Sequence, residues 1–178
     1  MTWLPTDSFV TWCRGLDVIT LSGWFTESGR PPAATGESSG WVWAVHDAYA
    51  TAERYGAWER ARDLTRADGA ESVFLASTPA CACPHGQNYL VPHCPQHPFQ
   101  FTYSRGGFEG TLFNLGRRRE SRRGGGMPDL LIRELLDARI VGRDTSRYDS
   151  DPDFNADGAH TLNNIAEHFG LPTTGLRP

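Results

Sequence analysis

The spacing of apolar residues predicts two helices and a strand in the first third of the chain. Residues 7–14 are expected to form a short helix, because Phe9, Trp12, Cys13 and Leu16 recur at i, i+3, i+4 and i+7. Cys13 lies on this apolar stripe, so we expect it in the core. Residues 17–26 are β-branched and aromatic, which favours a strand, and the Gly, Pro and Ser content of residues 27–40 predicts a loop. The longest helix is expected over residues 41–65.

The remaining pattern predicts a strand, a hairpin and two further helices. Residues 71–77 are expected to form a strand, and alternating residues on both sides of Gly106 and Gly107 predict a β-hairpin. Pro128 is expected to open a helix that runs to about Val141. A last helix is expected over residues 161–169, where Leu162, Ile165, Ala166 and Phe169 form one stripe before Gly170.

These elements predict an α+β fold: a small mixed domain with three or four helices, a β-hairpin and an embedded Cys/His metal-binding loop. A chain of 178 residues with 39% hydrophobic content can bury one ordinary core. We expect one domain overall, with a helix-strand-helix core portion over 1–78 and the Cys/His loop with the hairpin over 79–116. A basic glycine-rich arm over 117–127 and a C-terminal helical portion over 128–178 complete it.

Residues 81–97, which we call the Cys/His segment, are dense in metal-ligating side chains. Three cysteines and three histidines fall within these seventeen residues. Thiolate and imidazole are the ligands that zinc prefers, and four of them close a tetrahedral structural site. The expected zinc ligands are Cys81, Cys83, Cys94 and His97, with His85 and His93 as alternates. The other reading is a proline-rich loop with exposed histidines and reactive thiols.

Part of the same segment resembles the Rieske proteins. Cys83-Pro84-His85 and Cys94-Pro95-Gln96-His97 are similar to the C-x-H and C-x-x-H halves with which that family holds a [2Fe–2S] cluster. The resemblance covers about twenty residues. It implies an electron-transfer protein with a [2Fe–2S] cofactor. The two halves stand only eight residues apart, and Pro98 occupies the position at which the family has glycine.

A second distinctive stretch is the arginine run, residues 117–123. It carries five arginines and one glutamate in seven residues. Such a run can follow a phosphate backbone, or it can contact an acidic protein partner. Its members are Arg117, Arg118, Arg119, Arg122 and Arg123.

Asp153, Asn155 and Asp157, followed by Gly158, look like the opening of an EF-hand or dockerin-type calcium loop. Oxygen ligands at every second residue before a tight glycine turn suit calcium. However, His160 and Asn164 stand at loop positions eight and twelve, where an aliphatic residue and an acid are usual. The alternative is that these residues cap the following helix and interact with its dipole.

Composition and the lack of a catalytic signature shape the functional expectation. The net charge is −4, and all seventeen basic residues are arginine, as codon bias in a GC-rich genome would produce. The N-terminus lacks a secretory pattern and no apolar stretch could span a bilayer, so we expect a cytoplasmic protein without membrane contact. We expect a non-enzymatic, zinc-stapled assembly or adaptor subunit with protein partners, of the kind found in a phage-type particle. The alternative is a nucleic-acid-binding accessory protein that uses the arginine run.

Overall fold

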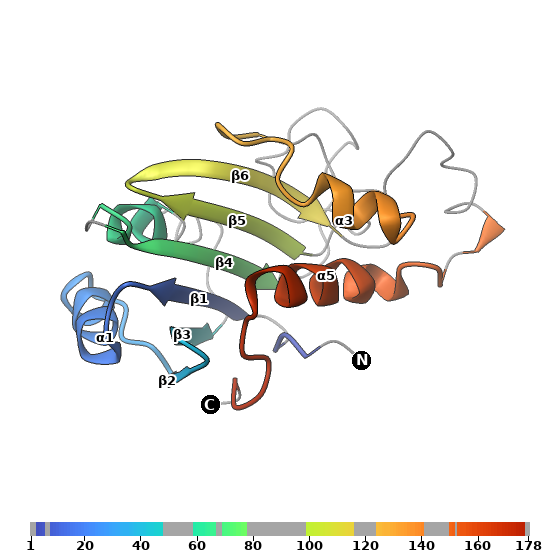
Figure 1. Ribbon diagram of the computed structural model, residues 1–178. Helices are drawn as coiled ribbons and strands as arrows, with labels where there is room; N and C mark the ends of the chain where they lie inside the picture. Colours follow the sequence, from blue (N-terminus) through green and yellow to red (C-terminus); the bar gives the residue numbers. More distant parts are fainter. Residues whose placement is uncertain are drawn as a thin grey trace.

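The computed structural model contains a six-stranded antiparallel sheet with helices on both faces (Figure 1). It describes residues 3–5, 8–47, 59–66, 69–77, 99–115, 124–140, 150–151 and 153–176. The strands lie in the order β2-β3-β1-β4-β5-β6. They are β1 (Ser8–Arg14), β2 (Ala34–Ser38), β3 (Trp41–Asp47), β4 (Glu71–Ser77), β5 (Phe99–Arg105) and β6 (Phe108–Leu115).

The described part of the chain also contains several helical elements. They are α1 (Val18–Glu27), α3 (Ile132–Asp137), the 3-10 turn η1 (Ala156–Gly158) and α5 (Ala159–Phe169). Residues 59–64 are also helical. The expected mixed α+β class is confirmed, although the sheet dominates it. Within the described residues, no helix is both long and apolar enough to cross a bilayer.

The main core lies between one face of the sheet and α5, which crosses in front of the strands in Figure 1. Trp12, Trp43 and Phe101 belong to the sheet side of this core, and Leu162 and Ile165 of α5 close it. The segment after α5 also contributes, because Leu171 and Leu176 are buried in the same cluster. Removing this much apolar surface from water is the principal stabilising term of the fold.

Smaller helical elements cover the opposite face. Leu21 and Phe25 of α1 pack on Cys13, Val42 and Ala44. Helical residues 59–64 place Ala61 against Phe9, Phe74 and Ala76 in a separate cluster. Strands β1, β3 and β4 are therefore covered on both faces, which explains why almost all of their residues are buried.

Because these strands are buried on both faces, two of the helices expected from the sequence are wrong. Residues 8–14 form the strand β1 and not a helix. Every residue from Ser8 to Cys13 is buried, so the helical spacing of Phe9, Trp12 and Cys13 does not mark a single buried face. Residues 41–47 form the strand β3, so the helix expected over 41–65 is wrong for its first third. Only 59–64 of the described residues in that range are helical.

The strand expected over residues 17–26 is a helix, α1. The Asp17 carboxylate accepts a hydrogen bond of 2.7 Å from the amide of Thr20, and this N-cap outweighs the β-branched residues that follow. Leu21 and Phe25, four residues apart, provide its buried face. The loop expected over residues 27–40 contains the short strand β2.

The later elements match their sequence patterns more closely. The strand over 71–77, the hairpin around Gly106 and Gly107 and the last helix are confirmed. The helix expected from Pro128 to Val141 is shorter. Leu131 before α3 has a φ of 68°, and Leu136 of α3 is 47% exposed.

Candidate functional site

The Cys/His segment and the arginine run both lie outside the described residues, but the structure fixes where each one leaves the sheet. Ser77, the last residue of β4, pairs with Phe99, the first residue of β5. Phe99 pairs in turn with Leu115, the last residue of β6. The chain therefore departs toward both segments from adjacent positions at one end of the sheet, which we call the loop end. The four expected zinc ligands belong to a hairpin connection whose two ends meet.

The arginine run is followed by a glycine segment that returns to the outer edge of β6. The amide of Gly126 donates to the carbonyl of Glu109 at 3.0 Å, and the amide of Met127 donates to the carbonyl of Gly110. A Cβ on Gly125 would lie 2.5 Å from the Gly110 carbonyl oxygen, and Gly125 has a φ of 93°. Glycine is required there for close backbone approach. The arginine run is thus tied to the same strand on both sides.

The expected calcium loop divides into an exposed and a buried part. Asp153 is exposed, whereas Asn155 is buried. The Asn155 side-chain oxygen accepts from the amide and the hydroxyl of Thr161, both at 3.2 Å, and its amide nitrogen donates to that hydroxyl at 3.0 Å. These bonds connect the turn before α5 to Thr161 in the first turn of that helix. Within the described part of the chain, no three His, Cys, Asp or Glu side chains are grouped to hold a metal ion.

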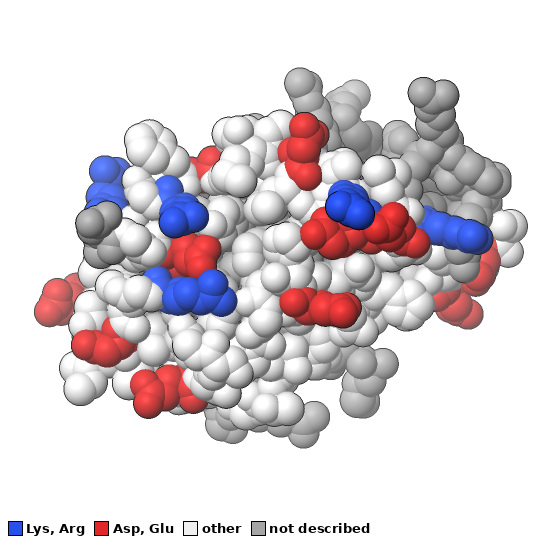
Figure 2. Space-filling model, in the orientation of Figure 1, with Lys and Arg blue, Asp and Glu red and all other residues white. Residues whose placement is uncertain are grey.

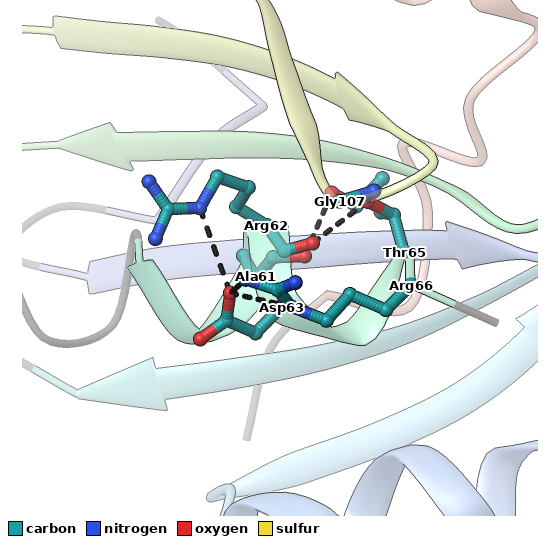
Figure 3. A network of polar contacts seen from close by, with 7 residues as sticks. Ala61, Arg62, Asp63, Thr65, Arg66 and Gly107 are labelled. Atoms are coloured by element: carbon teal, nitrogen blue, oxygen red, sulfur yellow. Dashed lines mark hydrogen bonds and ion pairs between the residues drawn. The ribbon is translucent and has the colours of Figure 1, made fainter.

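A polar network that the sequence pattern did not indicate joins residues 61–66 to the β5–β6 turn (Figure 3). The Thr65 hydroxyl donates to the carbonyl of Arg62 at 2.7 Å and accepts from the amide of Gly107 at 2.8 Å. Arg66 donates twice to one oxygen of Asp63, each time at 3.2 Å. The buried hydroxyl of Thr65 thus donates one hydrogen bond and accepts another. This network therefore holds the hairpin turn in place.

A second cluster lies at the turn end of the sheet, opposite the loop end. Arg14 pairs with Glu71 at 2.8 Å, lies 4.2 Å over the ring of Trp41 and donates to the carbonyl of Phe169 at 3.2 Å. The Trp41 indole donates to the same carbonyl at 3.0 Å. These bonds satisfy the C-terminal end of α5, where carbonyls lack helical partners. In Figure 2 the acidic and basic atoms alternate over this region instead of forming a field of one sign.

Tyr103 extends the same cluster. Its hydroxyl donates to the second carboxylate oxygen of Glu71 at 2.8 Å. Burial, and then this bond to Glu71, raise the pKa of Tyr103 to about 12. The tyrosine is therefore protonated at neutral pH and donates to Glu71.

His46 and Cys13 are the buried titratable groups on the α1 face. The His46 ring stacks on Phe9 with centroids 4.3 Å apart, and its Nε2 donates to the carbonyl of Arg30 at 3.1 Å. Burial lowers the pKa of His46 to about 4, so the ring is neutral at pH 7. Asp47 follows it on the same strand and is exposed. Because successive strand residues point to opposite faces, the two do not form a catalytic pair.

Cys13 is 1% exposed, and burial raises the pKa of its thiol to about 12. The expected core role of Cys13 is confirmed. A thiol held protonated away from solvent is neither a nucleophile nor a ready metal ligand.

Comparisons with protein-family models, with curated proteins and with solved structures found no match to this chain.

Proposed function

We propose that this chain is a non-enzymatic assembly or adaptor subunit that contacts its partner with the loop end of the sheet. A zinc ion bound by Cys81, Cys83, Cys94 and His97 would staple the Cys/His segment, with His85 and His93 as alternate ligands. The arginine run would supply the contacts. The observation that carries the proposal is the register Ser77–Phe99–Leu115, since both segments leave the sheet from adjacent positions at its loop end.

The length of the connection between β4 and β5 supports the proposed zinc ion. The connection between Ser77 and Phe99 is 21 residues long, counted from 78 to 98. A flexible loop of this length costs roughly 3 kcal/mol to close, and a staple inside it removes part of that cost. With four protein ligands the ion has no open position, so its binding energy serves folding and not catalysis.

The fixed flanks of the arginine run support the proposal that this run contacts a partner. Both of its flanks are fixed on β6, by the strand itself and by the bonds of Gly126 and Met127. A charged segment with fixed ends loses less conformational entropy on binding than a free tail does. The whole chain carries a net charge of −4, so it has no general attraction to nucleic acid, and the arginine run must act through local contacts. A subunit of a phage-type particle is one setting in which such contacts are needed.

The first experiment concerns the metal. Elemental analysis and an absorption spectrum of reduced, purified protein should show one colourless zinc per chain. Cys94→Ser should lose the metal and lower the melting temperature, because metal binding and folding are coupled. Cys13→Ser is the matched control, since it also removes one thiol but should keep the zinc. Protein without metal that melts identically with and without chelator would contradict the zinc site, and visible iron–sulfur bands would favour the Rieske-like alternative.

The loop end could contact either a protein partner or nucleic acid. The second experiment distinguishes an assembly subunit from a nucleic-acid-binding protein. If the arginines bind phosphates, affinity for a DNA duplex falls steeply with salt, and Ser at positions 117, 118 and 119 flattens the slope by about two to three units. We expect no such binding. The charge-matched control changes the exposed Arg105, Arg133 and Arg139 to Ser.

A photo-crosslinking amino acid in place of Arg118, introduced in the native host, gives the positive test. We expect a discrete protein adduct that a crosslinker in place of the exposed Arg133 does not give. Adducts that a nuclease removes would replace the assembly function with nucleic-acid binding.

A further inference from the structure

The two edges of the sheet differ in what covers them. Gly126 and Met127 bond to the outer backbone of β6 at Glu109 and Gly110. At the other edge, β2 pairs with β3, and no described residue pairs with its outer side. An uncovered strand edge offers a row of amides and carbonyls to another strand.

A shallow, open groove of about 530 Å³ lies beside this edge of β2. It runs between the outer side of α1 and Thr35 of β2. Glu27 is its one charged lining residue, and the others are apolar, small or hydroxyl-bearing: Val18, Ile19, Ser22, Gly23, Thr26 and Thr35. A nearly uncharged lining suits an apolar or neutral partner more than a strongly charged one.

The groove contains both a protrusion and a gap, one helical turn apart. Ile19 is 81% exposed, the highest value among the large hydrophobic residues described. Gly23 stands four residues later on α1, and a Cβ there would meet no atom within 4 Å. Residues at i and i+4 lie on one face of a helix. When two copies of such a helix pack antiparallel about a two-fold axis, the protrusion of each faces the gap of the other.

The geometry points to a second copy of this chain as the occupant of this surface. In this dimer, β2 pairs antiparallel with β2 of the other copy, and the two α1 helices pack side by side with Ile19 of each against Gly23 of the other. The two sheets then form one continuous sheet of twelve strands, twice the six of one copy.

The sequence of β2 is compatible with pairing about Gly36. With Gly36 on the axis, Thr35 faces Glu37 of the other copy, so a hydroxyl meets each carboxylate and like charges do not meet. Thr35 and Glu37 share the face of β2 that carries the groove, because Gly36 between them packs on the Trp43 ring. The two α1 helices therefore lie on the same side of the joined sheet. This inference does not rest on the function proposed above.

Sedimentation velocity on the full-length chain over a wide concentration range tests the dimer. A five-residue strand and one helix face bury a small area, so we expect a micromolar dissociation constant. Ile19→Ser and Gly23→Gln should each raise that constant at least tenfold. Gly23→Gln should not lower the melting temperature, because it replaces glycine within a helix at an open position. Leu136→Ser is the control, as Leu136 is an exposed apolar residue of α3 and should leave the constant unchanged.

Hydrogen exchange locates the contact. The amides of residues 34–38 should become better protected as protein concentration rises, and those of the β5–β6 turn should not. A chain that remains monomeric up to about 1 mM would overturn the inference. Dimers that form equally well in Ile19→Ser and Gly23→Gln, or that leave residues 34–38 unprotected, would do the same.

Discussion

Gly125→Ala should release the glycine segment from β6. The added Cβ would lie 2.5 Å from the carbonyl oxygen and 2.8 Å from the carbonyl carbon of Gly110, a contact with backbone that cannot move aside. Gly125 also has a φ of 93°, which alanine adopts only with strain. Gly126→Ala is a closely matched control, because its Cβ would be 3.7 Å from the nearest atom, the Glu109 oxygen.

Two costs set the size of the effect. Left-handed backbone costs a residue with a Cβ roughly 1–2 kcal/mol. The alternative is to detach the segment, which gives up the backbone bonds of Gly126 and Met127, each worth about 1 kcal/mol. The variant adopts whichever response, backbone strain or detachment, costs less free energy, so its free energy of unfolding should fall by about 2 kcal/mol. For a chain of this size that corresponds to roughly 4–8 °C in melting temperature.

The assay combines thermal unfolding with limited trypsin digestion. A shift of about 2 kcal/mol raises the population of the detached segment by roughly 30-fold, and cleavage after Arg122 or Arg123 should accelerate toward that factor. Gly126→Ala should change neither quantity by much. If the two variants unfold and are cleaved alike, the close approach of Gly125 to Gly110 does not hold the segment, and the anchoring of the arginine run loses its basis.

Three further predictions concern buried polar groups. In native, chelator-treated protein at pH 8, Cys13 should not react with a thiol reagent while the other three cysteines do, since burial raises its pKa to about 12; a fourth thiol that titrates before unfolding would contradict this. His46 has a folded pKa of about 4, below its usual 6.5, so its neutral form is favoured in the fold. The contribution of neutral His46 to the free energy of unfolding is complete above pH 6.5. It should be lost as pH falls toward 4, by up to about 3 kcal/mol. The free energy of unfolding of His46→Gln, measured in urea, should lack that part of the pH dependence. Tyr103→Phe removes the donor to Glu71 and should cost about 1–2 kcal/mol in urea unfolding, whereas an unchanged midpoint would show that this bond adds no stability.

The sequence pattern predicted elements that bury one side. Helix α5 has apolar residues on one stripe and ends at Gly170, which has a φ of 65°, so both its period and its stop were readable. The β5–β6 hairpin was readable from its glycine turn. Strands β1 and β3 were not, because helices cover both of their faces and their residues are buried regardless of position. Burial on both sides depends on distant parts of the chain, which local spacing does not encode.

The candidate site also has features that could be predicted from the sequence and features that depend on the fold. The composition of the Cys/His segment and of the arginine run was visible as soon as the residues were counted. Their common origin at the loop end was not, because it depends on the register that aligns Ser77, Phe99 and Leu115. The need for glycine at position 125 follows from a backbone approach that only the folded sheet creates.

The placement of β1 has a consequence for how the protein is made. This strand is synthesised well before α5, yet it lies inside the sheet between β3 and β4, and α5 and the residues that follow it complete its core. Its Trp12 indole donates to the carbonyl of Pro172 at 3.2 Å, and Leu176 is buried in the same core. At ordinary translation rates, β1 waits on the order of ten to thirty seconds before these residues are synthesised. During that time β1 can pair with β3 and β4, but Val10 and Trp12, on the face that α5 covers, still lack their C-terminal partners. This apolar face should therefore stay accessible to chaperones until α5 has been made.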